Sequence, residues 1–456
     1  MGLNVDRKWI ETLERVFVYL LLAYVTLGFC NLTYGETIVS YVMYPAFLLG
    51  GALVLWRLVH WREYVRMPLL ACALLFLLSY AVSCAVNAEY FTKQAAVYFL
   101  LWCFYFLLLY TQPNDRGAED VLAGVRRFSL VFLGLTAVLV GISLWMLATG
   151  YWWAYRDPNN NGYEIAAGFF SGRLWGAFQD PIHGSVMCCA SIAACWYWFR
   201  RRRERWLRVL LAAGALVFVF YIAVSDSRNG MLCFGLTLCL LFVLSRPFGE
   251  RGWTVRKRAL CVLLAVLLLV GAVFLVKGVQ MLYNGLNDMV GDDLHRIERG
   301  YDTTSSVENF GNRRLDIWRS AVEIALCRPV FGVSFVGVVP FALEHLPQTY
   351  IVSQPDYWII NTLESELFNT LAGQGFVGLA ILAAWAVLAA VFVFRRFRSV
   401  PAGQRDEITL LTSIVCMLLV SAQFQGVMLH QVTPNSVLFW AFFGALLFLL
   451  RKSTET

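Results

Sequence analysis

The chain has 456 residues, of which 59% are hydrophobic, 15% aromatic and only 15% charged. Soluble domains usually carry about 25% charged residues and about 45–50% apolar ones. This composition excludes a soluble enzyme, a disordered protein and a nucleic-acid-binding protein. The net charge of +7 reports first on orientation, because lysine and arginine gather on the cytoplasmic side of membrane proteins.

Cysteine usage indicates neither disulfides nor a metal site. Of the twelve cysteines, Cys327 alone falls in a long polar stretch, and no two form a CxxC pair. Cysteines inside apolar runs act as small hydrophobic residues. The first apolar run begins near residue 16 and lacks a small-residue cleavage site, so we expect it to be a membrane span rather than a signal peptide.

Twelve apolar runs have a length close to the roughly 20 residues that cross a bilayer. They lie at 16–33, 38–56, 68–86, 94–111, 128–150, 181–199, 207–224, 230–245, 259–276, 369–394, 408–423 and 434–450. The sequence therefore predicts an all-α integral membrane protein with about twelve transmembrane helices. An even number of spans places both termini on one side.

Lysine and arginine indicate which side that is. If the termini are cytoplasmic, 26 of the 37 basic residues fall in cytoplasmic segments, including the clusters at 200–208 and 255–258. The positive-inside rule therefore predicts cytoplasmic termini. The same orientation exposes the long segment between the ninth and tenth runs on the outer face.

That segment, residues 278–366, is too long to be a simple connector. It divides the chain into spans 1–9 (residues 1–277), an extracytoplasmic loop (278–366), and spans 10–12 with a cytoplasmic tail (367–456). Within the loop, residues 312–326 carry Leu315, Trp318, Val322 and Ala325 at helical spacing, which predicts an amphipathic helix that ends before a proline at 329.

Arginines on the outer side are exceptions to the positive-inside rule. Arg173 precedes the sixth run, Arg228 lies in a tight turn, and Arg313, Arg314 and Arg319 begin the amphipathic helix. The planar guanidinium binds phosphate oxygens through two parallel hydrogen bonds. Arginines that converge from different loops would form a pyrophosphate site. Arg313 and Arg314 are adjacent, so we expect at most one of them to face it.

Ordinary structural roles compete with this interpretation. Arg228 can cap a helix end or contact lipid headgroups, and Arg319 can pair with the glutamate four residues later. Arg173 can form an ion pair with an acidic neighbour, Asp180 or Glu164. Both alternatives for each arginine remain open at the level of the sequence.

Three further polar residues have modest expected roles. His183 begins the sixth run close to Arg173, and we expect it to be a polar residue at a helix start rather than a phosphate ligand. Asp226 is expected to fix the geometry of Arg228. His345 is expected to be a loop residue.

Four segments in order carry a resemblance to a known family. They are GRLWGAFQDP before the sixth run, SRNG in a tight turn, NRRLDIWRSAVEIALCRPVFGVSF in the large loop, and ESELFNTLAGQGFVGLAILAAW leading into the tenth run. Together, over roughly residues 165–450, they resemble the O-antigen ligase and polymerase superfamily of bacterial envelope glycosyltransferases.

The resemblance implies a GT-C-like fold and substrates carried on undecaprenyl pyrophosphate at the outer face of the inner membrane. It implies no nucleotide sugar, no metal and no other cofactor. Arg173, Arg228 and one of Arg313 or Arg314 match the pyrophosphate-binding arginines of the family, where they would neutralise charge on the leaving diphosphate. A flippase and a chain-length regulator are candidate partners.

One departure from the family pattern bears on function. Ligases of the family usually carry a histidine before the span that follows the large loop, whereas residues 361–369 contain none, and the nearest, His345, lies upstream. Glu364 and Glu366 are candidate bases instead, with Glu366 slightly favoured, because a carboxylate of suitable pKa can accept the acceptor's proton. Either could instead mark the span boundary or pair with an arginine.

Three functions follow in order of preference. The first is a polymerase of lipid-linked oligosaccharide repeat units, and the second is a ligase of the same superfamily with another acceptor. The third is a multispan transporter of lipid-linked oligosaccharides. A transporter should show two similar halves and charged residues within its spans, and the sequence shows neither.

Overall fold

The computed structural model describes residues 7–157, 163–245, 254–291, 295–298, 313–353 and 360–453. These residues are mostly helical. The helices are α1 (Arg7–Phe29), α2 (Thr37–Val59), α3 (Leu70–Val86), α4 (Lys93–Cys103) with the π-helix η3 (Phe104–Tyr110), α5 (Ala118–Thr149), α6 (Pro181–Arg201), α7 (Arg205–Val224), α8 (Arg228–Leu244), α9 (Val255–Val290), α11 (Arg314–Cys327), α12 (Val338–His345), α13 (Glu366–Arg396), α14 (Arg405–Ser421) and α15 (Pro434–Lys452).

Each of the twelve apolar runs coincides with a helix. Among the described residues, nine helices are long and apolar enough to cross a membrane, and α3 and α8 are shorter apolar helices. The chain is therefore an integral membrane protein, while the count of twelve crossings stays a prediction. Helix α9 continues without a break past residue 277, the predicted end of the ninth span, to Val290.

The expectation of an all-α fold needs a correction between α5 and α6. Strands β1 (Trp153–Asp157), β2 (Tyr163–Phe170) and β3 (Arg173–Gly176) form an antiparallel sheet in the order β1-β2-β3. In its register Arg156 lies opposite Glu164. Aromatic residues here fit a membrane-interface belt equally well, so the composition of the segment did not reveal the strands.

The sheet packs closely on α5 because its last strand ends in a glycine. Gly176 has a φ of +64°, and a Cβ there would lie 2.1 Å from the hydroxyl oxygen of Ser143 on α5. The same hydroxyl accepts a hydrogen bond from the amide of Ala177, at 2.9 Å. The backbone of Asn31, just after α1, donates to the carbonyl of Ala177, at 2.9 Å. These contacts fix where the chain enters α6.

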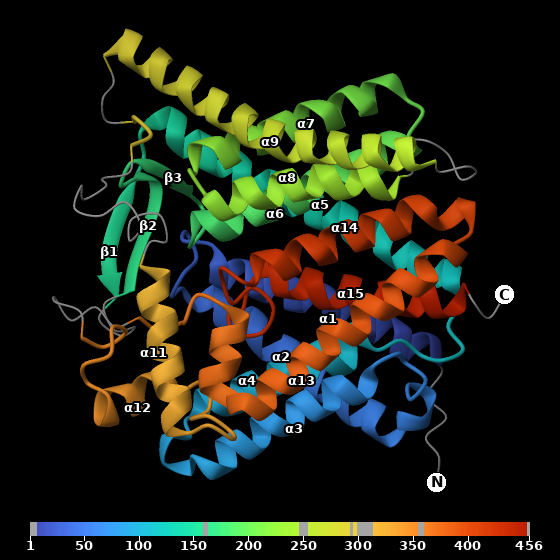
Figure 1. Cartoon of the computed structure of the whole chain (residues 1–456), viewed down its shortest axis with the longest axis vertical. Helices are drawn as coiled ribbons and strands as arrows, with labels where there is room; N and C mark the ends of the chain where they lie inside the picture. Colours follow the sequence, from blue (N-terminus) through green and yellow to red (C-terminus); the bar gives the residue numbers. More distant parts are fainter. Residues whose placement is uncertain are drawn as a thin grey trace.

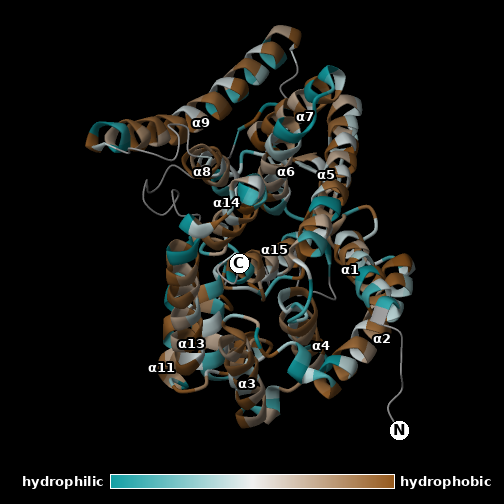
Figure 2. Ribbon diagram, turned by 90° about the vertical axis from the view of Figure 1, so that its right-hand side faces the viewer, coloured by the Kyte–Doolittle hydropathy of each residue, from teal (hydrophilic) through white to brown (hydrophobic). Residues whose placement is uncertain are grey.

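The molecule has a buried centre and an apolar periphery. Helices α6 and α15 are almost fully buried, and small residues along α6 allow neighbouring helices to approach closely. Helix α9 lies at the edge of the bundle and exposes much of its apolar surface (Figure 2). Figure 1 shows the sheet, α11 and α12 along the left side of the molecule and both chain termini on the right side.

The predicted amphipathic helix is present as α11, and its buried face overlaps the predicted stripe in part. Ala325 is buried and Trp318 packs against a small core, whereas Leu315 and Val322 are exposed. Ile317, Ala321 and Ile324, outside the predicted stripe, are buried in the same core with residues of α12 and α13. The end of the helix at Cys327, two residues before Pro329, is as predicted.

The exposed thiol of Cys327 offers a direct test of orientation, since it is the one fully exposed cysteine among the described residues. We expect a membrane-impermeant maleimide to label the wild-type protein in right-side-out vesicles, and Cys327→Ser to lose the label. A new cysteine at the exposed Arg203, in the Cys327→Ser background, should react only after the vesicles are opened. Labelling of position 203 in sealed vesicles would reverse the assigned orientation.

Candidate functional site

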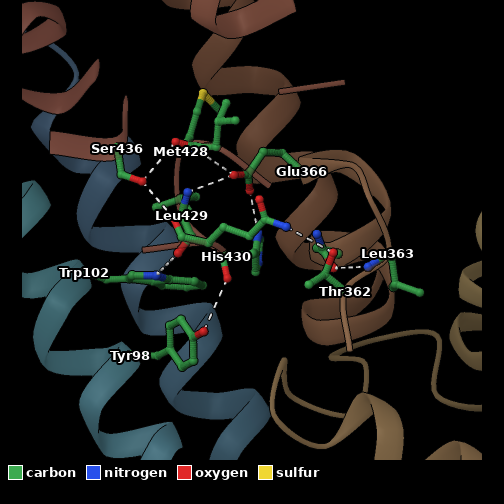
Figure 3. Close-up of polar contacts among 12 residues, drawn as sticks. Tyr98, Trp102, Thr362, Leu363, Glu366, Met428, Leu429, His430 and Ser436 are labelled. Carbon is green, nitrogen blue, oxygen red and sulfur yellow. Dashed lines mark hydrogen bonds and ion pairs between the residues drawn. The ribbon is translucent and has the colours of Figure 1, made fainter. Parts of the chain in front are cut away.

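The loop between α14 and α15, residues 422–433, forms the centre of the candidate site. Glu366, the first residue of α13, accepts hydrogen bonds from the amides of Met428, at 2.6 Å, and Leu429, at 2.8 Å. Its second oxygen pairs with Nδ1 of His430. Figure 3 shows the carboxylate of Glu366 turned toward these three residues. The side chain of Glu366 is 1% exposed, so protein donors take the place of water around its carboxylate.

Tryptophan side chains hold the same loop from its other side. The indole of Trp102 on α4 donates to the carbonyl of Leu429, at 3.1 Å, and the indole of Trp440 on α15 donates to that of Met428, at 2.9 Å. The amide of Glu366 donates to the carbonyl of Ala422, at 2.8 Å. The loop is therefore tied to α4, α13 and α15 along most of its length.

Glu364 differs sharply from Glu366. It is half-buried and adopts a left-handed backbone conformation with a φ of 51°. Burial raises the pKa of its carboxyl to about 7, while the nearby Arg314 opposes and Asp180 adds to the increase. The hydroxyl of Thr362 donates to the carboxylate, at 3.1 Å. A group with a pKa near the operating pH suits general acid or base chemistry.

The three arginines at the start of α11 separate in space. The guanidinium of Arg314 lies 5.9 Å from the ring centre of Phe424 in the 422–433 loop and acts electrostatically on Glu364. Arg313 instead lies over the ring of Tyr350 and hydrogen-bonds with that residue. Arg319 is 80% exposed and pairs with Glu323, at 3.1 Å. Of the three, Arg314 is the one that the fold brings to the loop.

Asp180, which follows the sheet, reaches the 422–433 loop, and Arg173 lies seven residues before it in the sequence. Arg173 begins β3, and its guanidinium lies 4.9 Å from the ring centre of Trp175. Asp180 caps α6 by accepting from the amide of Ile182, at 2.7 Å. Its other carboxylate oxygen accepts from the side-chain amide of Gln425, at 2.8 Å. The junction between β3 and α6 is thus bonded directly to the 422–433 loop.

Arg228 is the first residue of α8, after the capping residue Ser227. The next residue, Asn229, donates to the hydroxyl of Ser421 at the end of α14, at 2.9 Å. This bond brings the start of α8 to the beginning of the 422–433 loop. Asp226, expected to fix the geometry of Arg228, accepts from Gln280 on α9, at 2.9 Å, and from Lys277.

Backbone strain accompanies these residues. Positive φ angles occur at Ser171 (52°), Asp226 (45°), Arg313 (54°) and Glu364 (51°), each of which is a candidate residue or lies within two positions of one. Such conformations cost roughly 1–3 kcal/mol each and gather at active and ligand-binding sites. Four separate segments therefore carry strain where the sequence predicted function.

The sequence analysis missed the residues of the 422–433 loop altogether. Gln425, His430 and Gln431 lie in the short polar link QFQGVMLHQVTPN between the last two apolar runs. The high density of amide and imidazole side chains in this short link could have indicated a function, because a simple connector does not require them. His345 lies instead in α12, where its Nε2 is 3.1 Å from the hydroxyl of Tyr90. Within the parts of the chain that the structure describes, His, Cys, Asp and Glu side chains form no group of three or more suited to a metal ion.

Comparison with family models identifies part of the chain. Residues 213–383 match the model described as O-antigen ligase. This region is an O-antigen ligase domain. It runs from α7 into α13 and includes Arg228, Arg314, Glu364 and Glu366. A comparison with curated proteins finds no match.

The match indicates the general class of activity. The family is one of O-antigen ligases and polymerases, so its match to residues 213–383 implies the transfer of lipid-linked glycans. The 422–433 loop, Asp180 and Arg173 lie outside the matched residues. The fold nevertheless joins the loop to the domain through Glu366, and Asp180 is bonded to the loop through Gln425.

Replacing Glu366 tests its structural role. We expect Glu366→Ala to lower the free energy of unfolding by about 3–5 kcal/mol, because it leaves the imidazole of His430 and two amides buried without their partner. Glu366→Gln should cost less, since its carbonyl oxygen can still accept from the two amides. Thermal unfolding in detergent measures both. Glu364→Gln, at a half-buried position, is the control. An equal loss of stability in that variant would contradict the assignment of the structural role to Glu366 rather than to Glu364.

Proposed function

We propose that the chain is a polymerase of undecaprenyl-pyrophosphate-linked oligosaccharide repeat units on the outer face of the inner membrane. The observation that carries this proposal is the position of Glu364, a half-buried carboxylate beside Arg314 at the start of α13. A base and a phosphate-binding cation next to each other suit the transfer of a glycosyl group from a diphosphate.

In the proposed reaction Glu364 accepts the proton of the acceptor sugar's hydroxyl. The hydroxyl oxygen forms a bond to the anomeric carbon of the donor as the bond to the diphosphate oxygen breaks, with inversion at that carbon. Arg173, Arg228 and Arg314 bind the departing diphosphate and neutralise its charge, so the step needs no metal. Stabilisation of charge that develops in the transition state is often the largest catalytic effect.

The choice of Glu364 over Glu366 revises the preference derived from the sequence. Glu366 is 1% exposed and accepts from two backbone amides in addition to its contact with His430. A carboxylate so enclosed offers almost no surface to a substrate. We also leave Arg313 and Arg319 out of the proposed diphosphate site, because their contacts are to Tyr350 and Glu323.

A ligase is the second candidate function, and the family description supports it. Against it stand the absence of a histidine in residues 361–369 and the environment of His430, which is 1% exposed and paired with Glu366. The deciding experiment supplies purified protein with a lipid-linked repeat unit and no other acceptor. A ladder of products that differ by one repeat unit supports the polymerase, and conversion only on addition of a different glycan or lipid acceptor overturns it.

Paired arginine variants on α11 test the diphosphate site. A hydrogen bond to a charged group contributes roughly 1.5–3 kcal/mol, so Arg314→Ala should lower kcat/KM about ten- to a hundredfold. The matched control is Arg319→Ala, five residues along the same helix, which should retain the wild-type rate. Arg228→Lys should also be slow, because an ammonium cannot supply the two parallel bonds of a guanidinium. Equal rates for Arg314→Ala and Arg319→Ala would remove α11 from the site.

The pH dependence of the rate tests the base. Because Glu364 must be ionised to accept a proton and its pKa is about 7, the rate should fall as pH drops through 7. Glu364→Gln should lower kcat by roughly 10²–10⁴-fold while still binding donor. In Arg314→Ala the half-maximal point should move to higher pH, since the guanidinium favours the charged carboxylate. A flat profile between pH 5 and 8 in the wild type would contradict the assignment.

A further inference from the structure

A chain of hydrogen bonds connects the buried start of α6 to Glu364. Nε2 of His183 lies 2.5 Å from the side-chain oxygen of Gln431. The amide nitrogen of Gln431 donates to the hydroxyl of Thr362, at 3.4 Å, and that hydroxyl donates to the carboxylate of Glu364, at 3.1 Å. The series of hydrogen bonds thus links three segments that are far apart in the sequence and ends at one carboxylate oxygen of Glu364.

Every link in this chain donates in the same direction. The oxygen of Gln431 can only accept, so the ring nitrogen of His183 carries the proton that it shares. The hydroxyl of Thr362 also accepts from the amide of Glu364, at 3.3 Å, which leaves its one proton for the carboxylate. Turning the amide group of Gln431 around would direct its oxygen at the hydroxyl of Thr362, which would then compete with Glu364 for the one hydroxyl proton.

His183, the first residue in this series of hydrogen bonds, is held rigidly. His183 is 2% exposed, and its ring packs edge-on against Phe29, with ring centres 5.2 Å apart. Its backbone carbonyl accepts from the side chain of Asn435 at the start of α15, at 3.3 Å. Among the described residues its Nδ1 has no hydrogen-bond partner. The sequence analysis had given His183 only the role of a polar residue at a helix start.

The geometry points to Gln431 and Thr362 as positioning residues, which orient the carboxylate of Glu364 through hydrogen bonds that begin at His183. The inference rests on the proposed role of Glu364 as the base. It assigns the 422–433 loop, which lies outside the O-antigen ligase domain match, an indirect part in catalysis, through the orientation of Glu364. It also explains why Glu366 fixes the loop so firmly, since Gln431 follows His430.

Charged groups on two other elements also act on Glu364. Arg314 on α11 favours its ionised form, and Asp180 at the start of α6 disfavours it. The hydroxyl of Thr362 adds to the effect of Arg314, because a hydrogen bond donated to a carboxylate stabilises the charged state. Loss of that hydroxyl therefore raises the pKa of Glu364, and the rate then requires a higher pH.

The experiment compares pH profiles of kcat/KM for full-length variants with the lipid-linked repeat unit as substrate. Thr362→Val should move the half-maximal point of the acid limb up by about one pH unit, with the rate largely recovered at high pH. Thr362→Ser retains the hydroxyl and should restore the wild-type midpoint. Gln431→Leu should shift the midpoint in the same direction by a smaller amount. Gln423→Leu is the matched control, because Gln423 lies in the same loop and its side chain, within the described residues, bonds the carbonyl of Leu419.

The outcomes separate the inference from the proposed function. A wild-type midpoint in Thr362→Val, or a loss of rate that is equal at every pH, overturns the positioning role even when Glu364→Gln is inactive. If Thr362→Val unfolds, the midpoints of Thr362→Ser and Gln431→Leu decide in its place. If Glu364→Gln itself keeps the wild-type profile, the base is wrong and the inference falls with it.

Discussion

The buried carboxylate of Glu366 is the contact on which the site depends. A carboxylate loses its hydration when it is buried, and such a group is stable only where protein donors replace the water. Here two amides and one imidazole do so, all from the 422–433 loop. The loop joins α14 to α15, so one side chain fixes the start of α13 to the helix pair that follows it.

Contacts of the 422–433 loop position the other residues of the candidate site. Gln425 donates a hydrogen bond to Asp180, just before α6. The ring of Phe424 contacts the guanidinium of Arg314 on α11. The hydroxyl of Ser421 accepts a hydrogen bond from Asn229 on α8. Each contact brings one end of a helix to the same face of the bundle. Because the elements come from widely separated parts of the chain, the site exists only once the whole bundle has packed.

Hydropathy alone predicted the helices well, since a bilayer demands long apolar runs and leaves little choice of structure. It could not predict the sheet after α5, whose strands are too short and aromatic to differ from an interfacial segment. Charge and family pattern selected Arg228, Arg314 and Glu364 as candidates, and their roles stay predictions. The sequence analysis did not select the 422–433 loop, because its polar side chains are uncharged amides and imidazoles. Their contacts, such as that of Gln425 with Asp180, join residues that are far apart in the sequence.

The contrast between Glu364 and Glu366 shows how two neighbouring carboxylates acquire different properties. Glu366 starts a helix and points into the protein, where amide donors surround it. Glu364 precedes the helix in a left-handed conformation that turns its side chain another way. It keeps one hydroxyl donor, one guanidinium neighbour and partial exposure, and its pKa is about 7. Since the strain at Glu364 has to be offset by the surrounding structure, the firm binding of Glu366 two residues later supplies the stability that lets Glu364 hold this conformation.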